Sequence, residues 1–318
     1  MGESNAYLRP EVLGRIANLG LRARRVVEGV ISGQHRSPMH GLDVEFASYR
    51  EYAPGDDLKR LDWRVYGRSN RYYIKQYEEE SNLRATILMD ASASMAYPRH
   101  FPRHFPRFGS RARSEADLSM TKYDYAATVA ASLAALLVRQ RDAVGLAMFD
   151  DERREVIAPA ATAAQLAKIV HVLEQANPQR STRLGDVMLE TAERLRRRGM
   201  VIIISDLLTD LDRFHEGLGR FQHQGHDILV VQVLHADELD LPFDGSVQFN
   251  DLESDADVFA EPRFFRRDYQ QAMQSFCEDI ARRCRGAGID TIQLRTDMDL
   301  GLALSHFLFV RSRITRRT

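Results

Sequence analysis

Thr86-Ile87-Leu88-Met89-Asp90-Ala91-Ser92-Ala93-Ser94 shows most directly which architecture this chain adopts. The stretch opens with apolar and β-branched residues, which are typical of a strand buried on both faces of a parallel sheet. We expect Asp90, Ser92 and Ser94 in an exposed loop beyond the carboxyl end of that strand, where ligands bind in open α/β sheets. These hard oxygen donors suit Mg²⁺, with Mn²⁺ or Ca²⁺ as alternatives. The simpler interpretation is a polar turn that caps the next helix, because Ser and Asp are favoured N-cap residues.

A second apolar run, at 200–204, also ends in a carboxylate. Asp206 therefore follows a second buried strand and is expected at the same edge of the sheet as Asp90. Between the two strands, Thr182 lies in a polar loop before a predicted helix, where a hydroxyl can cap the helix or face a metal ion. Ser181 beside it is the alternative hydroxyl ligand. The sequence predicts one divalent-metal site, formed by Asp90, Ser92, Ser94, Thr182 and Asp206.

The segment before this site combines two short strands and a turn. The first predicted strand, at 41–46, alternates apolar and polar residues, and Pro54-Gly55 marks the turn. Leu61-Asp62-Trp63 follows the turn within a short amphipathic piece. A second alternating strand at 72–77 can pair with the first, so we expect a small β unit here.

The metal-site residues and the segment before them resemble two known sequence patterns. The order Asp-x-Ser-x-Ser, then Thr, then Asp is similar to the metal-ion-dependent adhesion site of von Willebrand factor A domains. Together with the upstream segment, it resembles the signature of the bacterial family called domain of unknown function 58, and the similarity extends almost to the end of the chain. Two features depart from that pattern: an insertion at 97–120 with a tandem Pro-Arg-His-Phe repeat, and Ser181 where a glycine is expected.

Strands and helices alternate from residue 84 onward, which indicates a mostly parallel sheet with helices on both faces. With the resemblance, this predicts an α/β fold: a von Willebrand factor A-like (Rossmann-like), doubly wound, mostly parallel sheet with an N-terminal β unit and a C-terminal αβα extension. A return strand at 153–158 is expected to run antiparallel. We expect three parts: 1–83 with the N-terminal helix and the β unit, 84–238 with the von Willebrand factor A-like domain and the 97–120 insertion, and 239–318 packed on that domain. The expected strands are 85–89, 144–149, 200–205, 227–234 and 289–294, and the expected helices are 11–31, 122–140, 163–176, 184–198, 211–224, 265–285 and 299–310.

The composition is that of an ordinary globular protein. Of 318 residues, 44% are hydrophobic and 28% charged, and the net charge of -1 gives no overall attraction to nucleic acid or anionic membranes. The first residues contain no apolar signal-peptide region, and the longest apolar run, at 126–138, falls short of the roughly 20 residues that span a bilayer. Cys277 and Cys284 are too far apart along one helix for a disulfide. We therefore expect a cytoplasmic protein without a membrane segment.

The resemblance implies a metal-dependent protein-interaction module, not an enzyme. Proteins of this family are commonly linked with MoxR-type AAA+ ATPases, so the expected role is an adaptor in protein assembly or activation that binds an acidic residue of its partner at the metal. Neither a small-molecule substrate nor nucleic acid is expected. Two alternatives stay open: a metal-dependent hydrolase such as a phosphatase, and a nucleic-acid binder that uses the basic insertion at 97–120. Against the hydrolase, Ser92 stands where phosphatases of the haloacid dehalogenase type have a second carboxylate, and no acid, base or lysine has an obvious position beside Asp90.

Overall fold

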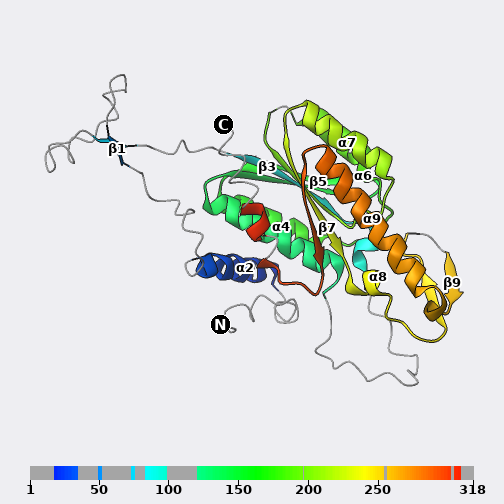
Figure 1. Ribbon diagram of the computed structural model, residues 1–318. Coiled ribbons are helices and arrows are strands. Elements are labelled where there is room, and N and C mark those ends of the chain that lie inside the picture. Colours follow the sequence, from blue (N-terminus) through cyan, green and yellow to red (C-terminus); the bar gives the residue numbers. More distant parts are fainter. Residues whose placement is uncertain are drawn as a thin grey trace. The chain divides into compact units, whose positions relative to one another are not determined.

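The computed structural model of the protein describes residues 18–34, 49–51, 73–75, 83–98, 120–195, 197–253, 256–301 and 304–308 (Figure 1). The chain divides into two units, one formed by 34–82 and the other by 1–33 together with 83–318. The expected strand at 41–46, the turn at Pro54-Gly55 and nearly all of the 97–120 insertion lie outside the described residues.

The larger unit is built on one six-stranded sheet with the strand order β10-β7-β6-β3-β4-β5. Every neighbouring pair is parallel except β4 and β5, which are antiparallel. The predicted α/β fold with a mostly parallel sheet is therefore confirmed, including the antiparallel return strand. The strands are β3 (Arg84–Asp90), β4 (Ala143–Phe149), β5 (Arg153–Ala160), β6 (Met200–Ser205), β7 (Asp227–Leu234) and β10 (Asp290–Arg295).

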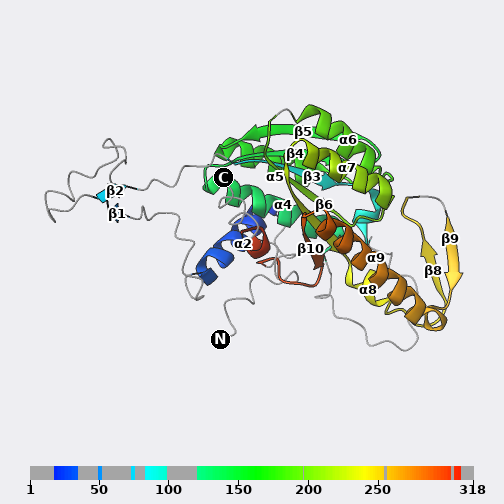
Figure 2. The ribbon, with the colours of Figure 1, turned by 45° about the horizontal axis from the view of Figure 1, so that its top comes forward.

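Helices cover both faces of this sheet (Figure 2). Each face has its own hydrophobic core. Successive strand residues point to opposite faces, so Ile202 belongs to one core and Ile203 to the other. The first core also contains residues of α2, α4, α5 and the segment 304–308, and the second contains residues of α6, α7 and α9. The helices are α2 (Leu19–Gln34), α4 (Lys122–Arg139), α5 (Ala163–Gln175), α6 (Leu184–Arg194), α7 (Leu211–His223) and α9 (Arg266–Gly286).

Helix α2 belongs to the sheet unit. Its apolar positions Leu19, Val26 and Val30 are buried in the first core, and Leu19 N donates a 2.9 Å hydrogen bond to Glu174 of α5. We expected this helix to belong with the small β unit, because periodicity shows that a helix has an apolar face but not what that face packs against.

The smaller unit contains one antiparallel pair among its described residues, β1 (Tyr49–Glu51) with β2 (Tyr73–Lys75). The second strand lies within the predicted 72–77 segment. The first lies just before the predicted turn, three residues beyond the end of the 41–46 segment that we expected to pair.

Two elements were not foreseen after β7. One is the short helix α8 (Ala236–Asp240), and the other is the hairpin of β8 (Val247–Asn250) and β9 (Asp257–Ala260). Both are too short for their hydrophobic period to be recognised in the sequence. Within the described part of the chain, no helix combines the length and the apolar character that crossing a membrane requires.

Candidate metal centre

Two neighbouring strands in the middle of the sheet bring the predicted site together. From β3, the chain continues to β4 and β5 on one side, whereas β6, β7 and β10 lie on the other side. The boundary between β3 and β6 is thus the point where the direction of winding changes, and ligands of open α/β sheets bind at the carboxyl ends of strands there. Met89 pairs with Ile204 across this boundary, so Asp90 at the end of β3 lies level with Ser205 at the end of β6, and Asp206 follows one residue further on.

Asp90 is the last residue of β3 and is completely buried. Its Oδ1 accepts a 2.8 Å hydrogen bond from Ser92 N, and its Oδ2 accepts a 2.6 Å hydrogen bond from Ser205 Oγ. Burial, with a further contribution from the charge of Asp206, raises the pKa of Asp90 to about 7. The expectation that Asp90 lies exposed in a loop was therefore wrong, because the strand extends one residue further than the apolar run suggests.

The hydroxyl loop, defined here as Ser92, Ser94 and Thr182, comes from two segments that lie against each other. Ser92 Oγ and Ser94 Oγ are 3.0 Å apart at a single turn of 3-10 helix (Ala93–Ala96). Ala93 N donates a 2.6 Å hydrogen bond to the carbonyl of Arg180, which brings the segment with Thr182 to this turn. The three hydroxyls that the sequence analysis selected are therefore delivered by two adjoining segments.

The hydroxyls do not serve as helix caps. Ser92 stands at the N-cap of the 3-10 turn but makes no capping hydrogen bond with its side chain. The N-cap residue of α6 is Arg183, not Thr182. Thr182 Oγ1 is buried and has no hydrogen-bond partner among the described residues, whereas Ser181 is exposed. A buried hydroxyl without a partner is costly, so Thr182 fits a ligand position better than Ser181 does.

Asp206 is held by a buried lysine that the sequence analysis missed. Lys122 Nζ lies 2.8 Å from Asp206 Oδ2 and 2.6 Å from Glu238 Oε1, and Leu208 N donates to Asp206 Oδ1. Burial alone would lower the pKa of Lys122, but the charges of Asp206 and Glu238 outweigh it and keep that pKa above its ordinary value, so the ammonium stays protonated. No lysine was expected to have an obvious position beside Asp90, and the structure shows that Lys122 binds Asp206 at the neighbouring strand end.

Lys122 opens helix α4, and Thr121 caps that helix by accepting a 3.0 Å hydrogen bond from Asp124 N. Glu238 lies in α8, where its Oε2 accepts a 2.8 Å hydrogen bond from His235 N in a capping box. The lysine-tyrosine start of α4 was visible in the sequence, but nothing there indicates that its ammonium reaches a strand end 84 residues further on.

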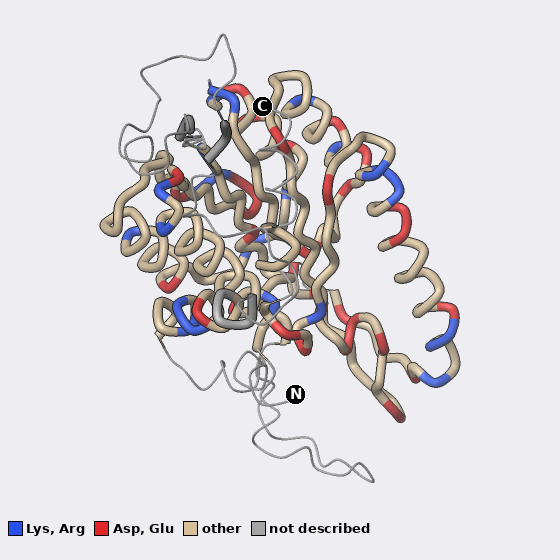
Figure 3. The backbone as a smooth tube through the Cα atoms, turned by 60° about the vertical axis from the view of Figure 1, so that its left-hand side comes forward, with Lys and Arg blue, Asp and Glu red and all other residues tan. Residues whose placement is uncertain are grey.

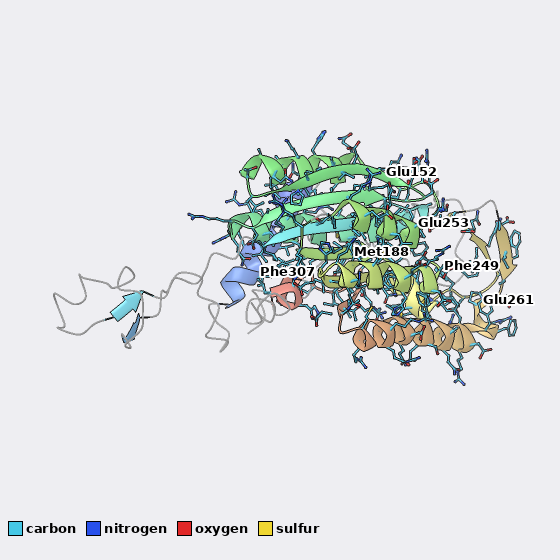
Figure 4. The ribbon with its side chains drawn as sticks, turned by 90° about the horizontal axis from the view of Figure 1, so that it is seen from above. Glu152, Met188, Phe249, Glu253, Glu261 and Phe307 are labelled. Atoms are coloured by element: carbon cyan, nitrogen blue, oxygen red, sulfur yellow. The ribbon has the colours of Figure 1, made fainter. Side chains whose placement is uncertain are left out.

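A fourth carboxylate reaches the hydroxyl loop from the β8–β9 hairpin. Glu253 Oε2 accepts a 3.3 Å hydrogen bond from Thr182 N. Burial, with a contribution from Asp206, raises the pKa of Glu253. Figure 4 shows Glu253 at the same end of the sheet as Glu152, which lies in the turn after β4.

The donor set fits a hard divalent cation. Its atoms are hydroxyl and carboxylate oxygens, the ligand type that Mg²⁺, Mn²⁺ and Ca²⁺ prefer, and Thr182 Oγ1 is an unused buried donor. Carboxylates outnumber cationic groups here, because Lys122 contacts both Asp206 and Glu238, and the charge of Asp206 also acts on Asp90. No cage of three or more His, Cys, Asp or Glu side chains suited to a metal occurs in the residues that the structure describes, so hydroxyls would have to contribute.

The site offers little for acid–base chemistry. A carboxyl group whose pKa is near 7 is a candidate general acid or base, but both oxygens of Asp90 are hydrogen-bonded and the side chain is buried. The ammonium of Lys122 is shared between two carboxylates and is also completely buried. This geometry favours holding a ligand over transferring a proton.

Comparison with protein families gives one match that covers most of the chain. Residues 48–276 match the model of the family described as "Protein of unknown function DUF58". The uncharacterized protein Rv1480 of Mycobacterium tuberculosis is 27% identical over 309 residues, which are 96% of this chain and 91% of that protein. The uncharacterized protein MAV169 of Mycobacterium avium is 33% identical over 119 residues, which are 37% of this chain and 69% of that protein.

Solved structures resemble the chain more distantly. The conserved hypothetical protein BatB of Bacteroides thetaiotaomicron is 12% identical with a TM-score of 0.46, over 72% of this chain and 99% of BatB. A von Willebrand factor type A protein of Catenulispora acidiphila is 11% identical with a TM-score of 0.34, over 48% of this chain and 34% of that protein.

Proposed function

The chain belongs to the DUF58 family, and from that premise we propose that it is a protein-interaction module which binds an acidic side chain of a partner through a divalent cation. The cation, Mg²⁺ in the first place, would be held by Ser92, Ser94 and Thr182. Asp90 and Asp206 support the site from the strand ends, directly or through water. The observation that carries the proposal is the buried, unpartnered Oγ1 of Thr182, on the segment that adjoins the paired hydroxyls of Ser92 and Ser94.

The protein's own residues explain why such a site would attract a carboxylate. Three of its donors are neutral hydroxyls, and Lys122 already balances part of the charge of Asp206. A cation bound there would keep net positive charge at an open coordination position, where a partner's Asp or Glu gains Coulomb energy in a partly dry environment. Ser205 and Leu208 N hold the two carboxylates in place through hydrogen bonds, so the site is organised before a ligand arrives.

The partner that the family resemblance suggests is a MoxR-type AAA+ ATPase of the same cell. Charged residues of both signs are interspersed along the described backbone (Figure 3). The basic insertion, on which the nucleic-acid alternative depends, lies outside the described residues, and no observation here favours that alternative or a hydrolase.

The test mixes the two purified proteins and measures binding with Mg²⁺ and with EDTA. We expect binding only with Mg²⁺, and loss of binding in the double variant Ser92→Ala with Ser94→Ala. Ser181→Ala is the matched control, because it removes an exposed hydroxyl from the neighbouring segment and should bind normally. Binding that survives both EDTA and the double substitution would show that the hydroxyl loop is not the contact site.

A further inference from the structure

Glu253 reaches the hydroxyl loop from a part of the chain that is distant in sequence. It lies 71 residues beyond Thr182, between β8 and β9, and its backbone N–H donates a 3.0 Å hydrogen bond to Asp251 within the same segment. Asp251 N in turn donates a 2.9 Å hydrogen bond to the carbonyl of Ala256, which closes the base of the loop. The hairpin therefore presents this carboxylate in a defined place.

Glu253 contacts the segment of the hydroxyl loop that carries Thr182. Its carboxylate accepts a hydrogen bond from Thr182 N, and the side chain of Ser94 lowers the pKa of that carboxylate. The proposed function requires an acidic side chain from outside at this same position. Two carboxylates cannot share it without strong mutual repulsion.

We propose that Glu253 is an internal carboxylate ligand of the cation site, so that a partner's acidic residue binds only by displacing the carboxylate of Glu253. This inference rests on the proposed function and describes how partner binding at the cation site would be regulated. In the free protein the carboxylate of Glu253 neutralises the site and closes it, and in the complex the partner's carboxylate takes its place. The interaction is then a competition between an internal and an external acid.

The surroundings of Glu253 are consistent with displacement. The side chain is only half-buried, in contrast to the completely buried Asp90 and Asp206. On the adjoining strand β9, Val258 and Phe259 are 61% and 70% exposed. These apolar residues pack little in the free protein and offer apolar surface to a partner.

The experiment compares the wild-type protein with Glu253→Ala and with the control Glu261→Ala. The control removes the same charge from the segment just after β9, where Glu261 pairs with Arg263 away from the hydroxyl loop. Mg²⁺ affinity is measured by calorimetry, and the water molecules bound to Mn²⁺ are counted by water-proton relaxation. A short peptide with a single glutamate serves as the external acid. Glu253→Gln, which preserves side-chain size, shows whether the alanine variant has simply lost its fold.

We expect Glu253→Ala to bind Mg²⁺ about tenfold more weakly, in line with the loss of one ligating group. The same variant should expose one more water on Mn²⁺ and bind the peptide more tightly, with Glu253→Gln changing in the same direction and Glu261→Ala unchanged. If the wild type binds Mg²⁺ and Glu253→Ala matches it in all three measurements, the internal ligand is refuted while the cation site stands. Equal changes in Glu253→Ala and Glu261→Ala refute it as well. If the wild type binds no Mg²⁺, the proposed function and this inference both fail.

Discussion

Lys122 Nζ lies 2.8 Å from the carboxylate of Asp206, and neither side chain is exposed to solvent. The ammonium also contacts Glu238, so one buried cation compensates two carboxylates from different elements. This pairing fixes the start of α4 against the end of β6. It thereby holds the carboxyl edge of the sheet, where the candidate site lies.

Removal of this lysine should destabilise the protein strongly. Lys122→Met leaves the carboxylates of Asp206 and Glu238 buried without their cation, and we expect the free energy of unfolding to fall by about 3–5 kcal/mol. Urea denaturation measures the change. Lys168→Met is the control, because Lys168 is exposed on α5 and its replacement should alter stability by less than about 0.5 kcal/mol.

The triple variant that adds Asp206→Asn and Glu238→Gln to Lys122→Met separates charge from packing. It removes all three charges together, so most of the lost stability should return. If Lys122→Met unfolds no more easily than Lys168→Met, the buried ion pair does not exist in solution.

The stability of the metal-free protein should depend on the protonation of Asp90. Its pKa is raised from 3.8 to about 7, so the folded state holds a proton that the unfolded state releases. Ionised Asp90 therefore destabilises the fold: the cost is absent below pH 4, grows as the pH rises from about 4 to 7, and is constant above, at no more than about 4 kcal/mol.

Asp90→Asn removes that cost because the amide cannot ionise. In EDTA, we expect the melting temperature of Asp90→Asn to exceed that of the wild type at pH 8, with the difference vanishing near pH 4. Thermal melts of both proteins across this range are the measurement. A constant difference at all pH values would show that Asp90 ionises normally in the folded protein.

Two glycines of helix α7 should respond in opposite ways to alanine. A Cβ on Gly217 would lie 2.8 Å from Met188 Cβ of α6, whereas a Cβ on Gly219 would meet nothing within 4 Å. Gly217→Ala should therefore destabilise the protein by about 1–3 kcal/mol through overpacking. Gly219→Ala should stabilise it by up to about 1 kcal/mol through helix propensity. The denaturation midpoints of the two variants measure these changes in stability. Equal midpoints would contradict the close packing of α6 on α7.

The sheet and its helices were largely predictable because their apolar patterns are local. Runs such as 200–204 indicate buried strands by themselves, and the alternation of strands and helices indicates a parallel sheet. The strand ends then located Asp90 and Asp206. Sequence reasoning could not give the burial of Asp90, because the apolar run stops one residue before the strand does.

The contacts that complete the site depend on tertiary structure. Lys122 and Glu253 reach it from 84 residues before Asp206 and 71 residues after Thr182, and no periodicity relates residues so far apart. The hairpin that carries Glu253 consists of two four-residue strands, which are too short to stand out from a loop. The partner of α2 was missed for the same reason, because an amphipathic pattern does not say which surface covers it.

The central claim, a divalent cation held by the hydroxyl loop, is tested most directly by titration calorimetry with Mg²⁺ on the wild type, Thr182→Val and Ser181→Ala. Thr182→Val keeps the shape of the side chain and removes only the buried Oγ1, which has no other partner among the described residues. We predict one binding site in the wild type, the same affinity in Ser181→Ala, and affinity at least about tenfold weaker in Thr182→Val. Absence of binding in the wild type, or equal binding in all three proteins, would contradict the account.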